Sequence, residues 1–188
     1  MVTKSLMTVL LLLLVTLVSS SPQAFAEEPS SVFDVTFKAS TPFSVALDTL
    51  QKQINYTFES VELLRRAMTH ASYSEENNKA LSILGSSIIE SSIALQSLIK
   101  DADISAKDLN CMIADASRVE SSCNADGTRL GLQKILRASR KTNVMAPAVV
   151  CGAFRAVLGA VAVDAGSSDE AGRVYAKIHR GIGKAMTM

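Results

Sequence analysis

Apolar residues recur at helical spacing through much of the chain, and the clearest case lies at residues 78–99. There Leu81, Leu84 and Ile88 fall at positions i, i+3 and i+7, which places them on one face of a helix. Gly85 and several serines lie between them. Because these residues are small, we expect another element to approach this helix closely.

The same spacing predicts further helices on both sides of this one. They run from Pro42 to about Asn55, from Glu59 or Ser60 to Met68, from Ser105 to about Asp115, from Ser117 to Leu130 and from Ser168 to about Ile182. Gly131 should end the fourth of these, and Asp126–Gly127 permits an earlier end. The pattern therefore predicts an all-α fold.

The stretch 145–163 is apolar at every position except Arg155. Its length alone would permit a membrane span. Pro147, two glycines and an arginine in mid-span argue against that, because a charge at the centre of a bilayer is costly. We therefore expect a buried core helix here.

The first 26 residues have the three parts of a secretory signal. Lys4 precedes an apolar run at residues 6–18, and Ala24-Phe25-Ala26 supplies small residues before a cleavage point. We expect this leader (1–26) to direct the chain to the secretory pathway, meaning the ER lumen, the nuclear envelope or the outside of the cell. An uncleaved anchor and import into another organelle are the alternatives.

The remaining chain divides into a short arm and one domain. Residues 27–41 contain Pro29 and polar residues and indicate an extended linker or arm, and residues 42–188 form the domain. Without the leader, the chain holds 18 basic and 18 acidic residues, since the leader carries one Lys of the 19 basic residues and no acid. A net charge of zero does not favour binding to nucleic acid, because phosphate contacts require Lys or Arg.

One stretch departs from this charge balance, since its cations have no acid among them. They are Arg129, Lys134, Arg137, Arg140 and Lys141. The pattern is typical of a solvated helix face, and that interpretation is favoured. The alternative is a surface that binds an anion or RNA.

Three cysteines follow the leader, at Cys111, Cys123 and Cys151. An odd number leaves one thiol free or paired between chains. Cys111 and Cys123 lie 12 residues apart across a predicted turn between helices, so they are the predicted disulfide, with three buried reduced thiols as the alternative. Asn55 begins the glycosylation sequon N-Y-T, which matters only if the chain enters the secretory pathway.

Three blocks of sequence resemble the ribonuclease III family, in the order that the family has them. Residues 56–73 contain Y-T-F and A-M-T-H-A-S-Y. Residues 78–87 are N-K-A-L-S-I-L-G-S-S, where the family has N-E-R-L-E-F-L-G-D-S. Residues 152–166 are G-A-F-R-A-V-L-G-A-V-A-V-D-A-G, where the family has D-A-F-E-A-L-I-G-A-I-Y-L-D-G-G. The resemblance implies a helical-bundle endonuclease domain over 42–188, without the double-stranded RNA-binding domain that often follows it.

The same resemblance implies a site in which acids from two helices hold Mg²⁺ for the cleavage of double-stranded RNA. The matching positions here are Lys79, Ser82, Ser86, Gly152 and Arg155, so all five acids are replaced. A lysine about 5 Å from a divalent ion would be repelled by roughly 6–7 kcal/mol at an effective dielectric constant of 20. We therefore expect no catalytic residue and no metal or other cofactor, with Mg²⁺ relevant only if catalysis survives.

The resemblance also implies a partner subunit, because an apolar residue at the position of Ile83 inserts into the partner in this family. We expect a homodimer or pairing with a related ribonuclease III-like domain, with Ile83 in its own core as the alternative. His70 matches a scaffold position, so packing or capping is favoured over catalysis. The leading hypothesis is an inactive domain that acts by binding an unidentified protein. The alternative is a double-stranded RNA binder or a residual RNA endonuclease.

Overall fold

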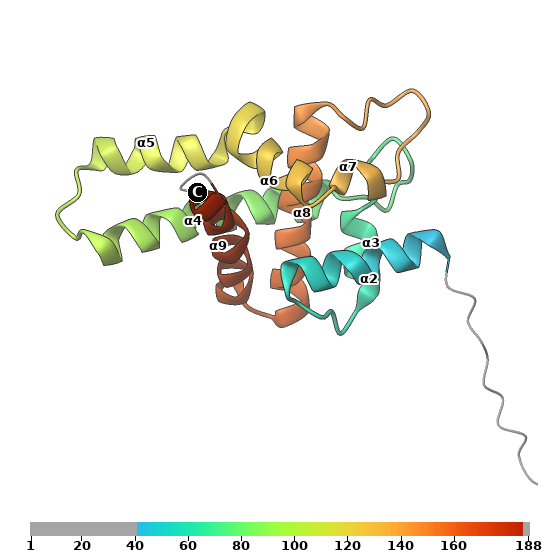
Figure 1. Cartoon of the computed structure of the whole chain (residues 1–188), viewed down its shortest axis with the longest axis horizontal. Coiled ribbons are helices and arrows are strands. Elements are labelled where there is room, and N and C mark those ends of the chain that lie inside the picture. The colour runs from blue at the N-terminus through green and yellow to red at the C-terminus, as the bar shows by residue number, and fades with distance from the viewer. Residues whose placement is uncertain (1–40, 186–188) are drawn as a thin grey trace, which may run out of the picture. The chain divides into compact units, whose positions relative to one another are not determined.

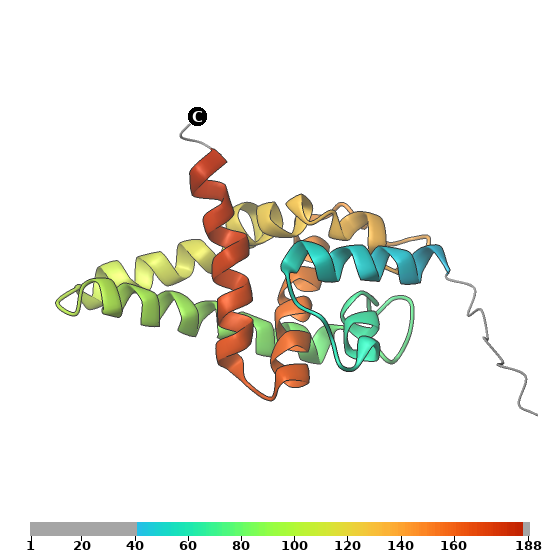
Figure 2. The ribbon, with the colours of Figure 1, turned by 60° about the horizontal axis from the view of Figure 1, so that its bottom comes forward.

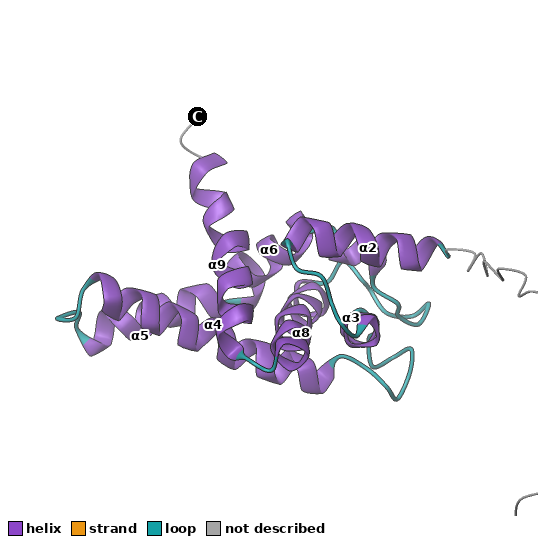
Figure 3. Ribbon diagram, turned by 90° about the horizontal axis from the view of Figure 1, so that it is seen from below, coloured by secondary structure: helices purple, strands orange, loops and turns teal. Residues whose placement is uncertain are grey.

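The structure is a computed structural model that describes the backbone of residues 41–185 and the side chains of residues 41–179. The predicted leader and all but the last residue of the predicted arm lie outside the described residues. The described part is helical and contains no strand, which confirms the all-α prediction (Figure 3). A single isolated bridge joins Thr69 to Arg137 within it.

The helices follow the predicted ranges closely except at residues 117–135. In chain order they are α2 (Pro42–Ile54), α3 (Val61–Ala67), α4 (Lys79–Lys100), α5 (Ala106–Ser117), the π-helix η1 (Val119–Cys123), α6 (Asn124–Arg129), α7 (Leu132–Ile135), α8 (Pro147–Ala165) and α9 (Ser168–Ala185). Thr41 caps α2 through its side chain, Ser105 caps α5 in the same way, and Asn55 ends α2 with a left-handed φ of 53°.

The predicted helix from Ser117 to Leu130 is instead divided between η1 and α6. Gly127 lies inside α6 and does not end it, because the glycine packs against α8. A methyl group at Gly127 would lie 2.8 Å from Cγ1 of Val150. The glycine is therefore a packing contact, and the earlier end that Asp126–Gly127 permitted does not occur.

Helix α8 is the core of the fold, and α4, α6, α9 and α3 pack around it (Figure 1). Side chains are buried at nearly every position from Val150 to Ala162. By length and composition both α8 and α4 could cross a bilayer, but other helices cover most of the apolar surface of α8. The prediction of a buried core helix is confirmed.

The crossing of α4 and α8 depends on two glycines, one on each helix. Because neither has a side chain, the backbone of the other helix can come close. Gly85 of α4 lies against the carbonyl of Arg155, and Gly159 of α8 lies against the carbonyl of Leu81. A Cβ atom at either position would fall within about 2 Å of that carbonyl oxygen. The expected close approach to α4 is confirmed, and it holds the first two turns of α4 against the middle of α8.

The cysteine pairing differs from the prediction. Cys123 is bonded to Cys151, and Cys111 is exposed and free. Figure 2 shows α5 running beside α4, and the chain after α5 turns back onto α8. This turn brings the Cα atoms of Cys123 and Cys151 to 5.1 Å, within the range for a disulfide, whereas Cys111 faces solvent on α5.

Candidate functional site

A pocket of about 390 Å³ lies where α4 and α8 begin. The loop after α3, the first turns of α4 and the first turns of α8 provide its walls. They contribute His70, Asn78, Lys79, Ser82, Ile83, Ala148, Val149 and Gly152. The pocket therefore contains part of the site expected from the sequence.

The five replaced acid positions do not all line the pocket. Lys79, Ser82 and Gly152 line the pocket, but Ser86 and Arg155 do not. A guanidinium nitrogen of Arg155 donates to the Ser117 carbonyl oxygen at 2.8 Å, at the end of α5. Arg155 therefore satisfies a terminal helix carbonyl.

The pocket does not fit Mg²⁺, which prefers carboxylate and other oxygen ligands in an octahedron. Its polar side chains are an ammonium, a hydroxyl, an amide and an imidazole. Within the described residues no three His, Cys, Asp or Glu side chains are grouped so that they could hold a metal ion. Glu75 and Glu76 are exposed in the preceding loop, and Glu90 is exposed on α4 beyond Ser86. None of these acids lines the pocket.

The polypeptide before α4 is held by hydrogen bonds that set the position of Asn78 and Lys79. The Asn78 N–H donates to the Thr69 carbonyl at 2.9 Å, and the Lys79 N–H donates to Oδ1 of Asn77 at 3.1 Å. Asn77 thus caps α4, although Asn78 is the residue directly before it. The Asn78 side chain is left in the pocket wall, and Asn78 is only 5% exposed.

His70 has a structural role, consistent with the scaffold interpretation. The backbone N–H of His70 donates to the Arg137 carbonyl oxygen at 2.8 Å. The ring Nδ1 of His70 accepts from the backbone N–H of Ser72 at 3.1 Å. The Ser72 hydroxyl in turn accepts from the Ser139 N–H. These bonds join the loop after α3 to the loop between α7 and α8.

The basic stretch does not form one surface. Arg129 pairs with buried Asp126 at 2.9 Å. Arg137 donates to Oγ1 of Thr69, and its guanidinium carbon lies 4.6 Å from the centre of the Phe43 ring. These two arginines stabilise the fold. The other three cations are exposed, namely Lys134, Arg140 and Lys141.

Ile83 is 73% exposed, so the alternative that it fills its own core is wrong. Leu84 beside it is also exposed, and both residues lie in the first two turns of α4. Leu95, Leu98 and Ile99 are exposed near the other end of the helix, where Leu95 lines a pocket with α9 and Ile99 lines a pocket with Met112 of α5. Isolated apolar side chains on a surface are common, so the candidate binding face on α4 is the neighbouring pair Ile83 and Leu84.

Sequence reasoning assigned no role to Asp164, which fastens the end of α8 to the α2–α3 loop. Its carboxylate accepts from the Tyr56 hydroxyl and from the N–H groups of Glu59 and Ser60, at 2.8–2.9 Å. Burial acts to raise the pKa of Asp164, but these three donors hold the pKa below its ordinary value. Burial, followed by the bond to Asp164, raises the pKa of Tyr56.

A buried carboxylate, Asp126, links α6 to α9. Besides the pair with Arg129, it contacts Nδ1 of His179 at 3.0 Å, and the His179 ring stacks on Tyr175. Burial, and then the charge of Asp126, raises the pKa of Tyr175. Asp126 and His179 therefore join two elements of the fold and lie outside the pocket.

Comparisons with known proteins agree with this architecture. A family model described as Ribonuclease-III-like matches residues 60–181. Protein NUCLEAR FUSION DEFECTIVE 2 of Arabidopsis thaliana is 56% identical over 140 residues, which cover 74% of this chain and 73% of that protein. Ribonuclease 3 of Delftia acidovorans is 33% identical over 130 residues, 64% of this chain and 54% of that enzyme.

Among solved structures, the nuclease domain of ribonuclease III from Campylobacter jejuni superimposes with a TM-score of 0.68 at 22% sequence identity. The alignment covers 72% of this chain and 96% of that domain. The chain spans about half the length of the bacterial ribonuclease 3 relatives that it matches.

Proposed function

This chain belongs to the ribonuclease III-like family, and on that premise we propose that it is a catalytically inactive member that acts by binding protein through α4. The main observation behind this proposal is that Lys79 and Ser82 line the pocket at positions where the family has acids. A cation cannot replace the negative charge that a divalent metal requires. The 33% identity to Ribonuclease 3 of Delftia acidovorans supports the family and does not extend that enzyme's activity to this chain.

We infer that α4 pairs with α4 of a second copy of this chain or of a related ribonuclease III-like domain. The support is the exposed pair Ile83 and Leu84, together with a solved relative described as having a region involved in dimer formation of its nuclease domain. A two-fold interface uses the same surface on both subunits. An exposed apolar pair on one helix can contact its own copy across such an axis.

Sedimentation of the purified domain tests the pairing through Ile83→Glu. We expect the unchanged domain to sediment as a dimer and Ile83→Glu as a monomer, because the variant places a charge in an apolar contact. Val45→Glu is the matched control, since Val45 is a large exposed apolar residue on α2, 49% exposed. A monomer at every concentration for the unchanged domain would refute the proposal, as would an Ile83→Glu variant that still dimerises.

The biological role that we propose is nuclear fusion (karyogamy) during plant reproduction. The support is the 56% identity to the Arabidopsis protein whose name describes a defect in nuclear fusion. Expression of this chain in Arabidopsis plants lacking that relative should restore nuclear fusion, and Ile83→Glu should not. Failure of the unchanged chain, expressed at the relative's level, would contradict the role.

A secretory location is part of the same proposal. The sequon residue Asn55 is exposed at the end of α2, so an oligosaccharide could be attached without disturbing the core. We expect protein from plant cells to lose mass on treatment with a glycosidase, and Asn55→Gln to show no such loss. A mature N-terminus that retains residues 1–26 would contradict the cleaved leader.

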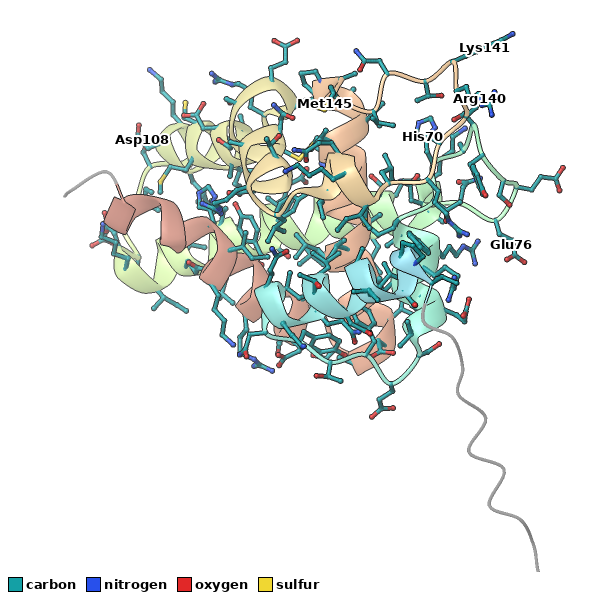
Figure 4. The ribbon with its side chains drawn as sticks, turned by 45° about the vertical axis from the view of Figure 1, so that its right-hand side comes forward. His70, Glu76, Asp108, Arg140, Lys141 and Met145 are labelled. Atoms are coloured by element: carbon teal, nitrogen blue, oxygen red, sulfur yellow. A yellow bond between two sulfur atoms is a disulfide. The ribbon has the colours of Figure 1, made fainter. Side chains whose placement is uncertain are left out.

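A second candidate function is the binding or cleavage of double-stranded RNA. The exposed Arg140 and Lys141 favour it, because they extend from the α7–α8 loop at the same end of the domain as His70 (Figure 4). Cleavage of duplex RNA that stops in chelator would replace the inactive proposal with an enzyme. Binding that weakens steeply with salt, without cleavage, would favour an RNA binder.

A further inference from the structure

The electrostatics at the start of α4 favour an anion. A helix of 22 residues begins there, and the first N–H groups of a helix point outward with partial positive charge. The first turn of α4 contains no acid. Lys79 adds a full positive charge at the pocket wall, and it forms no ion pair with any described side chain.

The Asn78 side chain is an independent sign of a missing ligand. Asn78 is 5% exposed and lines the pocket, and its side-chain amide makes no hydrogen bond within the part of the chain that the structure describes. The oxygen and nitrogen of this amide are not among the fully buried polar atoms, so they stay accessible to water or to a ligand. Asn77 already caps the helix, so Asn78 is not needed for that purpose.

The remaining polar groups complete a set of donors on more than one side of the same space. The Ser82 hydroxyl and the His70 imidazole line the pocket together with Asn78 and Lys79. The nearby acids, Glu75 and Glu76, lie in the loop before α4 and do not line it. Ammonium, amide and hydroxyl groups arranged in this way suit a tetrahedral oxyanion, because each can donate to a different oxygen.

We propose that this pocket binds a phosphate group, held by Lys79, Asn78 and Ser82 at the start of α4. Free inorganic phosphate and a phosphate monoester share the recognised chemistry. The exposed cations Arg140 and Lys141, at the end of the domain where His70 lies, raise the local concentration of anions (Figure 4). The pocket thus binds an anion through two of the positions, Lys79 and Ser82, where the family resemblance implies ligands for a cation. This inference does not depend on dimerisation.

Calorimetric titration of the purified domain at constant ionic strength tests this proposal with two ligands, inorganic phosphate and adenosine 5′-monophosphate. We expect saturable binding of phosphate, with Lys79→Gln weakening it at least tenfold. Lys100→Gln is the matched control, because Lys100 is exposed at the opposite end of the same helix. Tighter binding of the monophosphate would identify an ester as the ligand, and equal binding would identify the free ion.

Asn78→Asp provides a second variant, since it keeps the size of the side chain and adds a negative charge. We expect it to abolish phosphate binding while circular dichroism shows unchanged helix content. Sedimentation of Lys79→Gln separates this proposal from the proposed pairing, because we expect that variant to keep the oligomeric state of the unchanged domain. No saturable binding up to about 10 mM phosphate, or equal weakening in Lys79→Gln and Lys100→Gln, would overturn the proposal.

Discussion

Replacement of Gly85 by alanine should separate the two helices that build the pocket. A methyl group at Gly85 would lie 1.8 Å from the carbonyl oxygen of Arg155, and real Cβ atoms essentially never come closer than 3.0 Å to another heavy atom. The helices would therefore have to move apart by about 1.2 Å. The contacting atom belongs to the backbone, so a change of rotamer cannot relieve the clash.

The expected energy follows from two opposing effects. Alanine is favoured over glycine within a helix by about 1 kcal/mol. Overpacking of a core costs typically about 1–3 kcal/mol and more where the backbone must shift. We expect Gly85→Ala to lower the free energy of unfolding by about 2 kcal/mol, which corresponds to a fall in Tm of roughly 4–8 °C for a domain of this size.

Urea and thermal unfolding measure this effect, with Gly152→Ala as the matched control in α8. A methyl group at Gly152 would meet no atom within 4 Å, so this variant should gain about 0.5–1 kcal/mol. The two substitutions are chemically identical and should change stability in opposite directions. A Gly85→Ala domain at least as stable as the unchanged one would refute the close crossing of α4 and α8.

Two further predictions concern the bonds that join distant segments. Asp164→Asn should cost about 2 kcal/mol near neutral pH, because an amide cannot accept from all three donors, including the Tyr56 hydroxyl. The folded-state pKa of Asp164 is depressed, so its stabilisation is present above the unfolded pKa of about 4 and is lost as pH falls through the folded value. Urea unfolding should therefore show the gap between variant and parent shrinking below pH 4 and constant from pH 5 to 8; a gap independent of pH would contradict the role of the charge. Cys151→Ser should cost about 3–4 kcal/mol without reductant, since its bond to Cys123 closes a loop of 28 residues, whereas Cys111→Ser should change nothing. Equal losses in the two cysteine variants would contradict the pairing.

Periodicity was sufficient to predict α2, α3, α4, α5 and α9, because these helices depend on the local spacing of apolar residues. The buried position of α8 followed from its continuous apolar run and from Arg155, which argued against a membrane span. The division of residues 117–135 into η1, α6 and α7 was not predicted. The disulfide could not be predicted in this way. The pairing of Cys123 with Cys151 depends on how η1 turns back onto α8, which is a tertiary contact. Sequence proximity instead favoured Cys111, which lies on the solvent face of α5.

The partners of individual charged residues could not be predicted from the sequence for a related reason. Arg129 and Arg137 appear in the sequence as part of one basic stretch, yet Arg129 pairs with buried Asp126 and Arg137 lies over the ring of Phe43. Asp164 bonds to groups more than 100 residues earlier in the chain. A run of like charges gives composition along the chain, whereas burial and partners are set by the fold.

Two of the five replaced acids have become cations, and each has its own surroundings. Loss of the acids alone would require no partner for either side chain. Arg155 instead donates to the end of α5, and Lys79 stands beside the unpaired amide of Asn78 in a pocket without carboxylates. Gly85 and Gly159 meanwhile keep the two helices close enough for that pocket to exist. The maintained crossing of α4 and α8 and the lysine at a former acid position are together the arrangement expected if the pocket binds the phosphate that we propose.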